Sequence, residues 1–216
     1  MGSSISASEV GSIIANSREK VSAFCRQRYP IFKKLLSLSH SRALIFANDD
    51  EQIRVMAAST FFESSLRDSL YSVNLFRDGF DVVFRQSQGF EENTAKDGLL
   101  QCVHIHADSV PIDLFNAFKI TQSAEFVKLS KQSAKDHADC FLAHFPRVVD
   151  ARDAITHYHD RAFGRFRDTQ FSGKLGSSRI YNYGKTFIDN KGLEFDFDFD
   201  EAIFARYLED LDRIVA

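Results

Sequence analysis

Apolar residues recur at every third or fourth position along much of this chain, which is the spacing that gathers them on one face of an α-helix. The clearest example lies between residues 49 and 84. Its repeating positions are Val55, Ser59, Phe62, Leu66, Leu70, Val73, Phe76, Phe80 and Val83. With Asp49 or Asp50 as the N-cap, this pattern predicts a single helix of about 30 residues, which would be about 45 Å long.

Three prolines divide the rest of the helical pattern into segments. They are Pro30, Pro111 and Pro146. Because proline removes a backbone N–H and disfavours helical geometry in the residue before it, each is expected to begin or interrupt a helix. The sequence predicts a helix over 8–38 that is broken near Pro30, and a second long helix over 111–145. A further helix is predicted over 146–166, with Pro146 in its first turn. The polar, glycine-containing stretch 86–110 predicts a long loop or a small ordered excursion.

Near the C-terminus the period of the pattern changes from about 3.6 to 2. Leu193, Phe195, Phe197 and Phe199 alternate with Glu194, Asp196 and Asp198. Together with the aromatic and β-branched residues of 180–188, this alternation predicts two strands joined at 189–192. The resulting β-hairpin is expected to be an appendage spanning 177–200. An amphipathic helix over 203–214, capped by Asp200, is predicted to close the chain.

The expected fold class is therefore an all-α bundle of long antiparallel helices, with a small C-terminal β-hairpin followed by a helix. A chain of 216 residues can bury one sizeable core, so residues 1–216 are expected to form a single helical domain. Because the chain has 22 Phe and no Trp, that core should depend on Phe together with Leu, Ile and Val.

The net charge, the cysteines and the apolar runs of the chain limit the classes of function that it can have. A net charge of −3 does not favour a general nucleic-acid surface, so any such site must be local. The three cysteines, Cys25, Cys102 and Cys140, form no CxxC pair, which predicts reduced thiols in a cytoplasmic protein. No apolar run approaches the length of a membrane span, so no membrane contact is expected. The pattern for N-myristoylation at Gly2 is also matched, but the same residues resemble the start of an expression tag.

One segment concentrates ionisable side chains within about three helical turns. On a helical wheel, the face expected to meet the core carries Val148, Ala151, Ile155, Tyr158 and Ala162. A polar face roughly 130° away carries Asp150, Asp153, His157 and Arg161. Arg152 lies between the two faces, and its long side chain can bring the guanidinium beside His157.

This segment has two interpretations from its chemistry alone. The first is a solvated face whose ion pairs each contribute a few tenths of a kcal/mol. The second is a site for proton transfer or phosphate recognition. Histidine titrates near neutral pH, a flanking carboxylate can orient it, and arginine recognises phosphate in a planar fashion.

The run Arg152-Asp153-Ala154-Ile155-Thr156-His157 resembles the Arg-x4-His motif of the HEPN superfamily, in which a polar residue commonly follows the arginine. The family is an all-α bundle, usually homodimeric. Many members are metal-independent endoribonucleases in toxin-antitoxin, abortive-infection and other defence systems. The resemblance therefore implies an RNA substrate, a homodimer, no metal or other cofactor, and an antitoxin or regulatory partner.

The resemblance also implies roles for three residues. Arg152 would contact the scissile phosphate, His157 would transfer protons as the RNA 2′-hydroxyl attacks, and Asp153 would orient them, with the site completed by the partner subunit. The hairpin tail is not general to the family. His159 stands where an extended form of the motif has Tyr, so regulation by a nucleotidyltransferase antitoxin is not implied.

Two further hypotheses compete with a ribonuclease. A non-catalytic HEPN-type module would use the same helix face for dimerisation or partner binding, and the net acidity of the chain favours it. A metal-dependent hydrolase would draw ligands from Asp153 and His157, with His159 or the His104-x-His106 pair. The positive charge of Arg152 beside those ligands disfavours a bound cation.

Overall fold

The described part of the chain is mostly helical. In this computed structural model, the described residues are 6–43, 49–85, 94–130, 132–156, 179–182, 185–188, 193–196 and 201–215. The long helices are α1 (Ala7–Ala43), α2 (Asp49–Arg85) and α3 (Thr94–Thr121). The shorter ones are α4 (Ala124–Val127), α5 (Ala134–His144), α6 (Val148–Thr156) and α8 (Glu201–Val215). The strands are β1 (Arg179–Asn182), β2 (Lys185–Ile188) and β3 (Leu193–Asp196).

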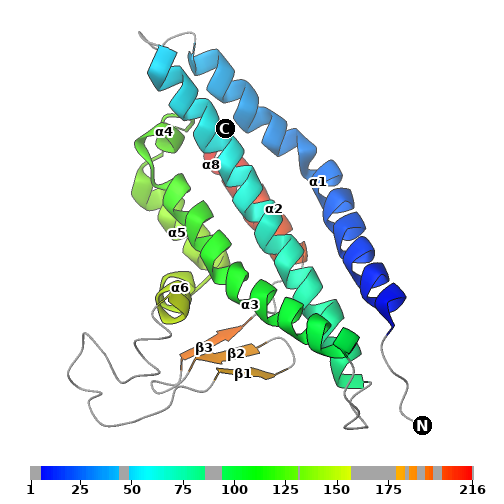
Figure 1. Ribbon diagram of the computed structural model, residues 1–216. Coiled ribbons are helices and arrows are strands. Elements are labelled where there is room, and N and C mark those ends of the chain that lie inside the picture. The colour runs from blue at the N-terminus through cyan, green and yellow to red at the C-terminus, as the bar shows by residue number, and fades with distance from the viewer. Residues whose placement is uncertain are drawn as a thin grey trace, which may run out of the picture.

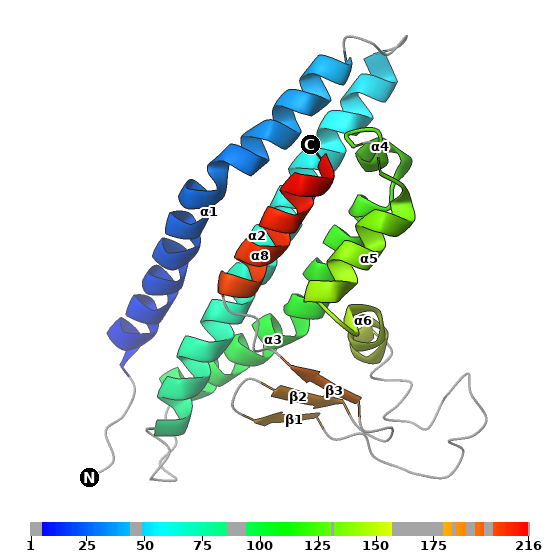
Figure 2. The same ribbon diagram turned by 180° about the vertical axis from the view of Figure 1, so that it is seen from behind.

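The helices form two layers. Helix α2 lies between α1 and α3, and α8 and α5 pack against the back of this layer (Figures 1 and 2). Helix α6 lies at the lower end of α5, where it contacts α3 as well as β2 and β3. None of the described helices combines the length and the apolar character that a membrane span requires.

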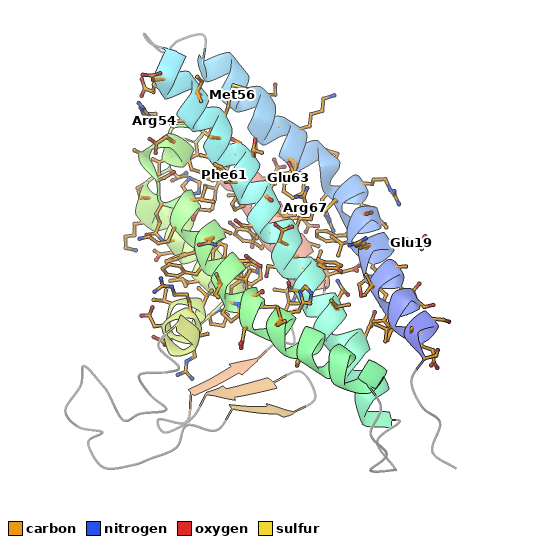
Figure 3. All side chains as sticks on the ribbon, in the orientation of Figure 1. Glu19, Arg54, Met56, Phe61, Glu63 and Arg67 are labelled. Atoms are coloured by element: carbon orange, nitrogen blue, oxygen red, sulfur yellow. The ribbon has the colours of Figure 1, made fainter. Side chains whose placement is uncertain are left out.

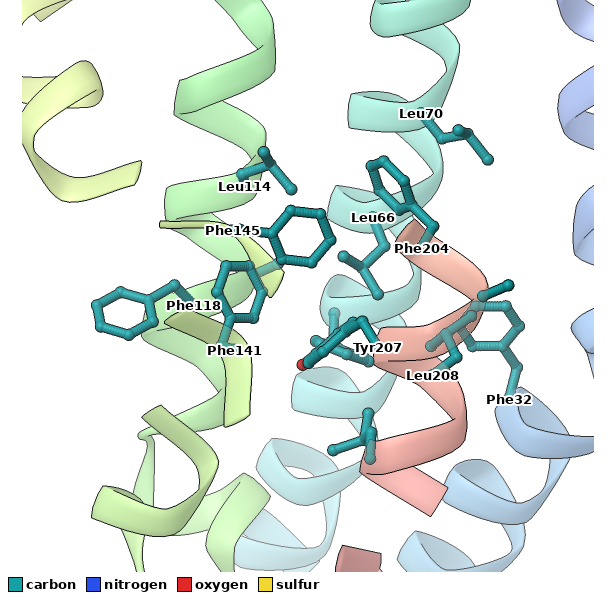
Figure 4. Packing of buried hydrophobic residues seen from close by; sticks show 14 of the residues in the cluster. Phe32, Leu66, Leu70, Leu114, Phe118, Phe141, Phe145, Phe204, Tyr207 and Leu208 are labelled. Carbon is teal, nitrogen blue, oxygen red and sulfur yellow. The ribbon is translucent and has the colours of Figure 1, made fainter. Parts of the chain in front are cut away.

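Aromatic side chains from both layers meet in the core (Figure 4). The ring of Tyr207 on α8 lies 5.1 Å from that of Phe141 on α5 and 6.3 Å from that of Phe62 on α2, between centroids. Phe145 lies 5.1 Å from Phe204 in the same way. All of these side chains are almost fully buried. The expectation of a core rich in Phe is confirmed.

The predicted faces of α2 and α8 are confirmed for the residues named next, whereas the side chains of Phe80 and Val83 lie outside the described residues. On α2 the buried members are Val55, Ser59, Phe62, Leu66, Leu70, Val73 and Phe76. On α8 they are Phe204, Tyr207, Leu208 and Leu211. The opposite side of α2 faces away from α8 and exposes Ile53 and Phe61, which are 62% and 63% accessible (Figure 3).

Two of the three prolines do not break the helices that contain them. Helix α1 continues through Pro30, so the predicted interruption of 8–38 is wrong. Helix α3 begins at Thr94 and continues through Pro111. Residues 94–110 are therefore helical, which corrects the loop predicted over 86–110, and Pro111 does not begin a helix. An internal proline costs about 3 kcal/mol, whereas each large apolar side chain that is buried contributes about 1.5–3 kcal/mol. Buried neighbours on both sides offset the cost: Val21, Phe24, Ile31, Phe32, Leu35, Val110, Leu114 and Ala117.

The predicted long helix over 111–145 is divided into the end of α3, then α4 and α5. Serine caps explain the new helix starts. The Ser123 hydroxyl accepts a hydrogen bond from the Phe126 N–H and caps α4. At α5, the Ser133 hydroxyl accepts from the Asp136 N–H, and the Asp136 carboxylate accepts from the Ser133 N–H, which forms a capping box.

Helix α6 begins two residues later than its predicted start at Pro146. Arg147 has a positive φ of 62°, and its carbonyl accepts the first hydrogen bond of the helix, from the Ala151 N–H. Arg147 therefore occupies the N-cap position and Pro146 precedes the helix, which corrects its placement in the first turn. The predicted continuation over 157–166 lies outside the described residues.

A three-stranded antiparallel sheet, in the order β1-β2-β3, takes the place of the single hairpin expected at 177–200. In its register Asn182 pairs with Lys185, and Ile188 pairs with Leu193. Residues 183–184, between the first of these pairs, and 189–192, between the second, lie outside the described residues. The expected N-cap of α8, Asp200, lies outside the described residues.

Candidate functional site

Helix α6 places the two described members of its predicted apolar face in the core. Val148 and Ala151 are fully buried, and Asp150 is exposed. The Arg147 guanidinium Nε lies 3.7 Å from the Asp150 carboxylate. Burial of one face against α3 therefore fixes how α6 presents its next two residues, Arg152 and Asp153.

The structure brings together two of the three residues that the sequence assigns to the site. Arg152 Nη1 donates a hydrogen bond to Asp153 Oδ1 over 2.8 Å. The side chains are 35% and 50% exposed, so both reach solvent. The third residue, His157, lies outside the described residues, as do the side chains of Ile155 and Thr156. The described half of the site is thus a charge-assisted pair at the surface of α6.

An aromatic ring lies beneath this pair. The guanidinium carbon of Arg152 is 4.9 Å from the centroid of the Phe115 ring on α3, within the range of a cation–π interaction. The sequence predicts a helix over 111–145, which contains Phe115, but no pattern in the sequence connects this residue to Arg152. The two residues are far apart in the sequence, so only the packing of α6 on α3 reveals the contact.

This arrangement suits recognition of an oxyanion. A guanidinium carries its N–H groups along its edge and can place its flat face on a ring, so contact with Phe115 leaves edge N–H groups that can bind a phosphate. The carboxylate of Asp153 fixes the guanidinium and can also accept a proton or a hydrogen bond. The pair can therefore position a phosphate group near the end of α6.

The histidines whose side chains the structure describes, His106, His137 and His144, have partners elsewhere in the fold. His137 Nε2 lies 2.7 Å from the Ser130 hydroxyl, and His144 Nε2 lies 2.8 Å from the Asp210 carboxylate. These contacts give both side chains a structural role. His106 was expected on a loop but lies on α3, 3.1 Å from the Ser72 hydroxyl. Burial lowers the pKa of both His106 and His137.

Neither a metal cluster nor a reactive thiol appears among the side chains that the structure describes. No group of three or more His, Cys, Asp and Glu side chains in this part of the chain is arranged to hold a metal ion. Cys25 and Cys140 are free thiols. Burial raises the pKa of both, that of Cys140 to about 11, so neither is activated as a thiolate nucleophile.

Asp113 lies two residues before Phe115 on α3 and has an unusual environment. Burial raises the pKa of its carboxyl to about 6, and the nearby Asp68 carboxylate on α2 adds to the rise. In the unfolded chain its pKa would be about 4. The folded state therefore binds this proton more tightly, which stabilises the fold below about pH 4 and is lost as the pH rises to about 6.

We expect Asp113→Asn to be more stable than wild type above pH 6 and equally stable near pH 4. The gain should not exceed about 1 kcal/mol, because a partly exposed carboxyl is screened by water. Urea unfolding at several pH values between 4 and 7.5 measures it. If the two proteins change stability in parallel over this range, the carboxyl of Asp113 is not the source of the pH dependence.

A comparison with known protein families, characterised proteins and solved structures finds no match to this chain.

Proposed function

We propose that this protein is a metal-independent endoribonuclease of HEPN type. The observation that carries the proposal is the Arg152–Asp153 pair on α6, joined over 2.8 Å with the guanidinium over Phe115. This pair supplies the arginine and the polar residue of the Arg-x4-His motif, at the surface and in the order that the motif requires. His157 completes the motif in the sequence.

In the proposed reaction, Arg152 holds the scissile phosphate and stabilises the charge that develops on its oxygens. The RNA 2′-oxygen forms a bond to phosphorus as the bond between phosphorus and the 5′-oxygen breaks. The products are a 2′,3′-cyclic phosphate and a 5′-hydroxyl. One proton leaves the 2′-hydroxyl and one is added to the 5′-oxygen. His157 carries out one of these transfers, and water carries out the other.

The proposed active species is a homodimer in which the partner subunit completes the site, and its activity is controlled by an antitoxin or similar regulatory partner. Two polar faces of the motif helix then meet about a two-fold axis. Light scattering at micromolar concentration is expected to give a dimer. A monomer that cleaves RNA would show that no partner subunit is needed to complete the site. The proposed roles of Arg152 and His157 in cleavage would be unaffected.

The alternative is a non-catalytic HEPN-type module for dimerisation or partner binding. Its support is the net charge of −3, since RNA binding depends mainly on phosphate neutralisation. The two functions differ in one measurable respect. Incubation of labelled RNA with the protein in excess EDTA should yield fragments with cyclic phosphate ends if the protein is an endoribonuclease, and intact RNA if it is a binding module.

We expect Arg152→Lys to lower the rate of this cleavage by about 10- to 100-fold. Lysine keeps the charge but loses the planar group, and a hydrogen bond to a charged group contributes about 1.5–3 kcal/mol. The matched control is Arg67→Lys on α2. Arg67 also lies beside an aspartate, with its Nε 3.6 Å from Asp68, and is similarly exposed. Equal cleavage by both variants would show that Arg152 does not contact the phosphate.

A further inference from the structure

We infer that Phe115 is a positioning residue for Arg152, and that its ring sets the plane in which the guanidinium meets the scissile phosphate. The inference rests on the proposed function, because it assigns Phe115 a role in the same site. Its basis is the distance of 4.9 Å between the Arg152 guanidinium carbon and the Phe115 ring centroid. No motif in the sequence contains Phe115.

The Phe115 ring is itself held in place by the core. It is half-buried and packs against the core cluster, with its centroid 6.2 Å from that of Phe118. Phe118 is 8% exposed and lies 5.6 Å from Phe141, which is fully buried. A ring connected to close-packed neighbours in this way has little room to move. The surface beneath Arg152 is therefore rigid.

Two contacts with described residues, Phe115 and Asp153, restrict the orientation of the guanidinium. The Phe115 ring holds the guanidinium carbon over its face and so limits the tilt of the guanidinium plane, because the attraction of a cation for a ring is strongest over the ring face. The hydrogen bond from Nη1 to Asp153 fixes its rotation within that plane. A planar group that is restricted in both tilt and rotation is preorganised for an oxyanion, so less ordering is required during the reaction.

The role of Phe115 is distinct from simple packing. Leucine or methionine at position 115 can fill much of the same space but has no ring face for a cation. Tyrosine keeps the ring. We therefore compare Phe115→Leu and Phe115→Met with Phe115→Tyr. Phe61→Leu on the exposed side of α2 serves as a matched control for removal of a phenyl ring. Melting temperatures identify any variant that does not fold.

The first measurement is the proton NMR signal of the Arg152 side chain, assigned by its absence in Arg152→Lys. A guanidinium over a ring face is shifted upfield. We expect this shift in wild type, Phe115→Tyr and Phe61→Leu, and its loss in Phe115→Leu and Phe115→Met. The second measurement is steady-state cleavage of RNA. Loss of the ring should lower kcat by about 2- to 30-fold with a smaller change in KM, and Phe115→Tyr should restore it.

The outcomes separate this inference from the proposed function. If wild type shows the upfield shift but cleaves no RNA, the proposed function fails and the role of Phe115 in cleavage fails with it, although the contact is real. If wild type cleaves RNA, and folded Phe115→Leu and Phe115→Met cleave it equally well after losing the shift, the function stands and the inference is overturned. Failure of Phe115→Tyr to restore kcat also overturns it.

Discussion

Replacement of His157 by alanine is expected to lower RNA cleavage by about 10²- to 10⁴-fold, because a positioned acid-base group typically contributes this much to the rate. The effect should exceed that of Arg152→Lys, which keeps a positive charge near the phosphate. Stability should barely change, since the helical wheel places His157 away from the apolar face of Val148 and Ala151. Single-turnover cleavage and the melting temperature together measure both effects.

His159→Ala is the control within the same segment. His159 lies two residues further along, closer on the wheel to the apolar face, and has no part in the Arg-x4-His motif. Its replacement should leave the rate of cleavage by folded protein unchanged. A His157→Ala protein that is folded and cleaves RNA at the wild-type rate would exclude a ribonuclease site at this position, and a variant that unfolds would show that His157 is structural.

The strongest sequence predictions concerned elements whose apolar pattern is long and regular. The buried face of α2 was predicted from periodicity, because each turn adds a further apolar residue to the same stripe. The local sequence does not predict that α1 continues through Pro30 and α3 through Pro111. A proline has a local cost, but whether a helix continues through it depends on burial of residues such as Phe32 and Leu114 by elements distant in the sequence.

In the candidate site, too, contacts between sequence neighbours can be predicted, whereas contacts between distant residues cannot. Arg152 and Asp153 are neighbours in the sequence, and their ion pair on one helix follows from their chemistry. The contact of Arg152 with Phe115 depends on the packing of α6 against α3, which no local pattern contains. The motif predicts that His157, which lies outside the described part of the chain, joins this pair, and His157→Ala tests that prediction.

Phe141→Ala should cost about 3–5 kcal/mol of stability, which is the usual range for removal of a buried phenyl ring. The Phe141 side chain is fully buried and links three parts of the core. Its centroid lies 4.9 Å from Phe145, 5.1 Å from Tyr207 and 5.6 Å from Phe118. For a chain of this size, each kcal/mol lowers Tm by about 2–4 °C, so we expect a decrease of about 6–20 °C.

Phe61→Ala makes the same chemical change on an exposed surface. The Phe61 side chain is 63% accessible on α2, so its removal leaves no cavity and should change stability by less than about 0.5 kcal/mol. Calorimetry of the two variants and wild type under one set of conditions compares them directly. A similar Tm for both variants would mean that Phe141 is not at the centre of the core. The Phe118 ring, and through it the surface that Phe115 offers to Arg152, would then lack the rigid support that preorganisation requires.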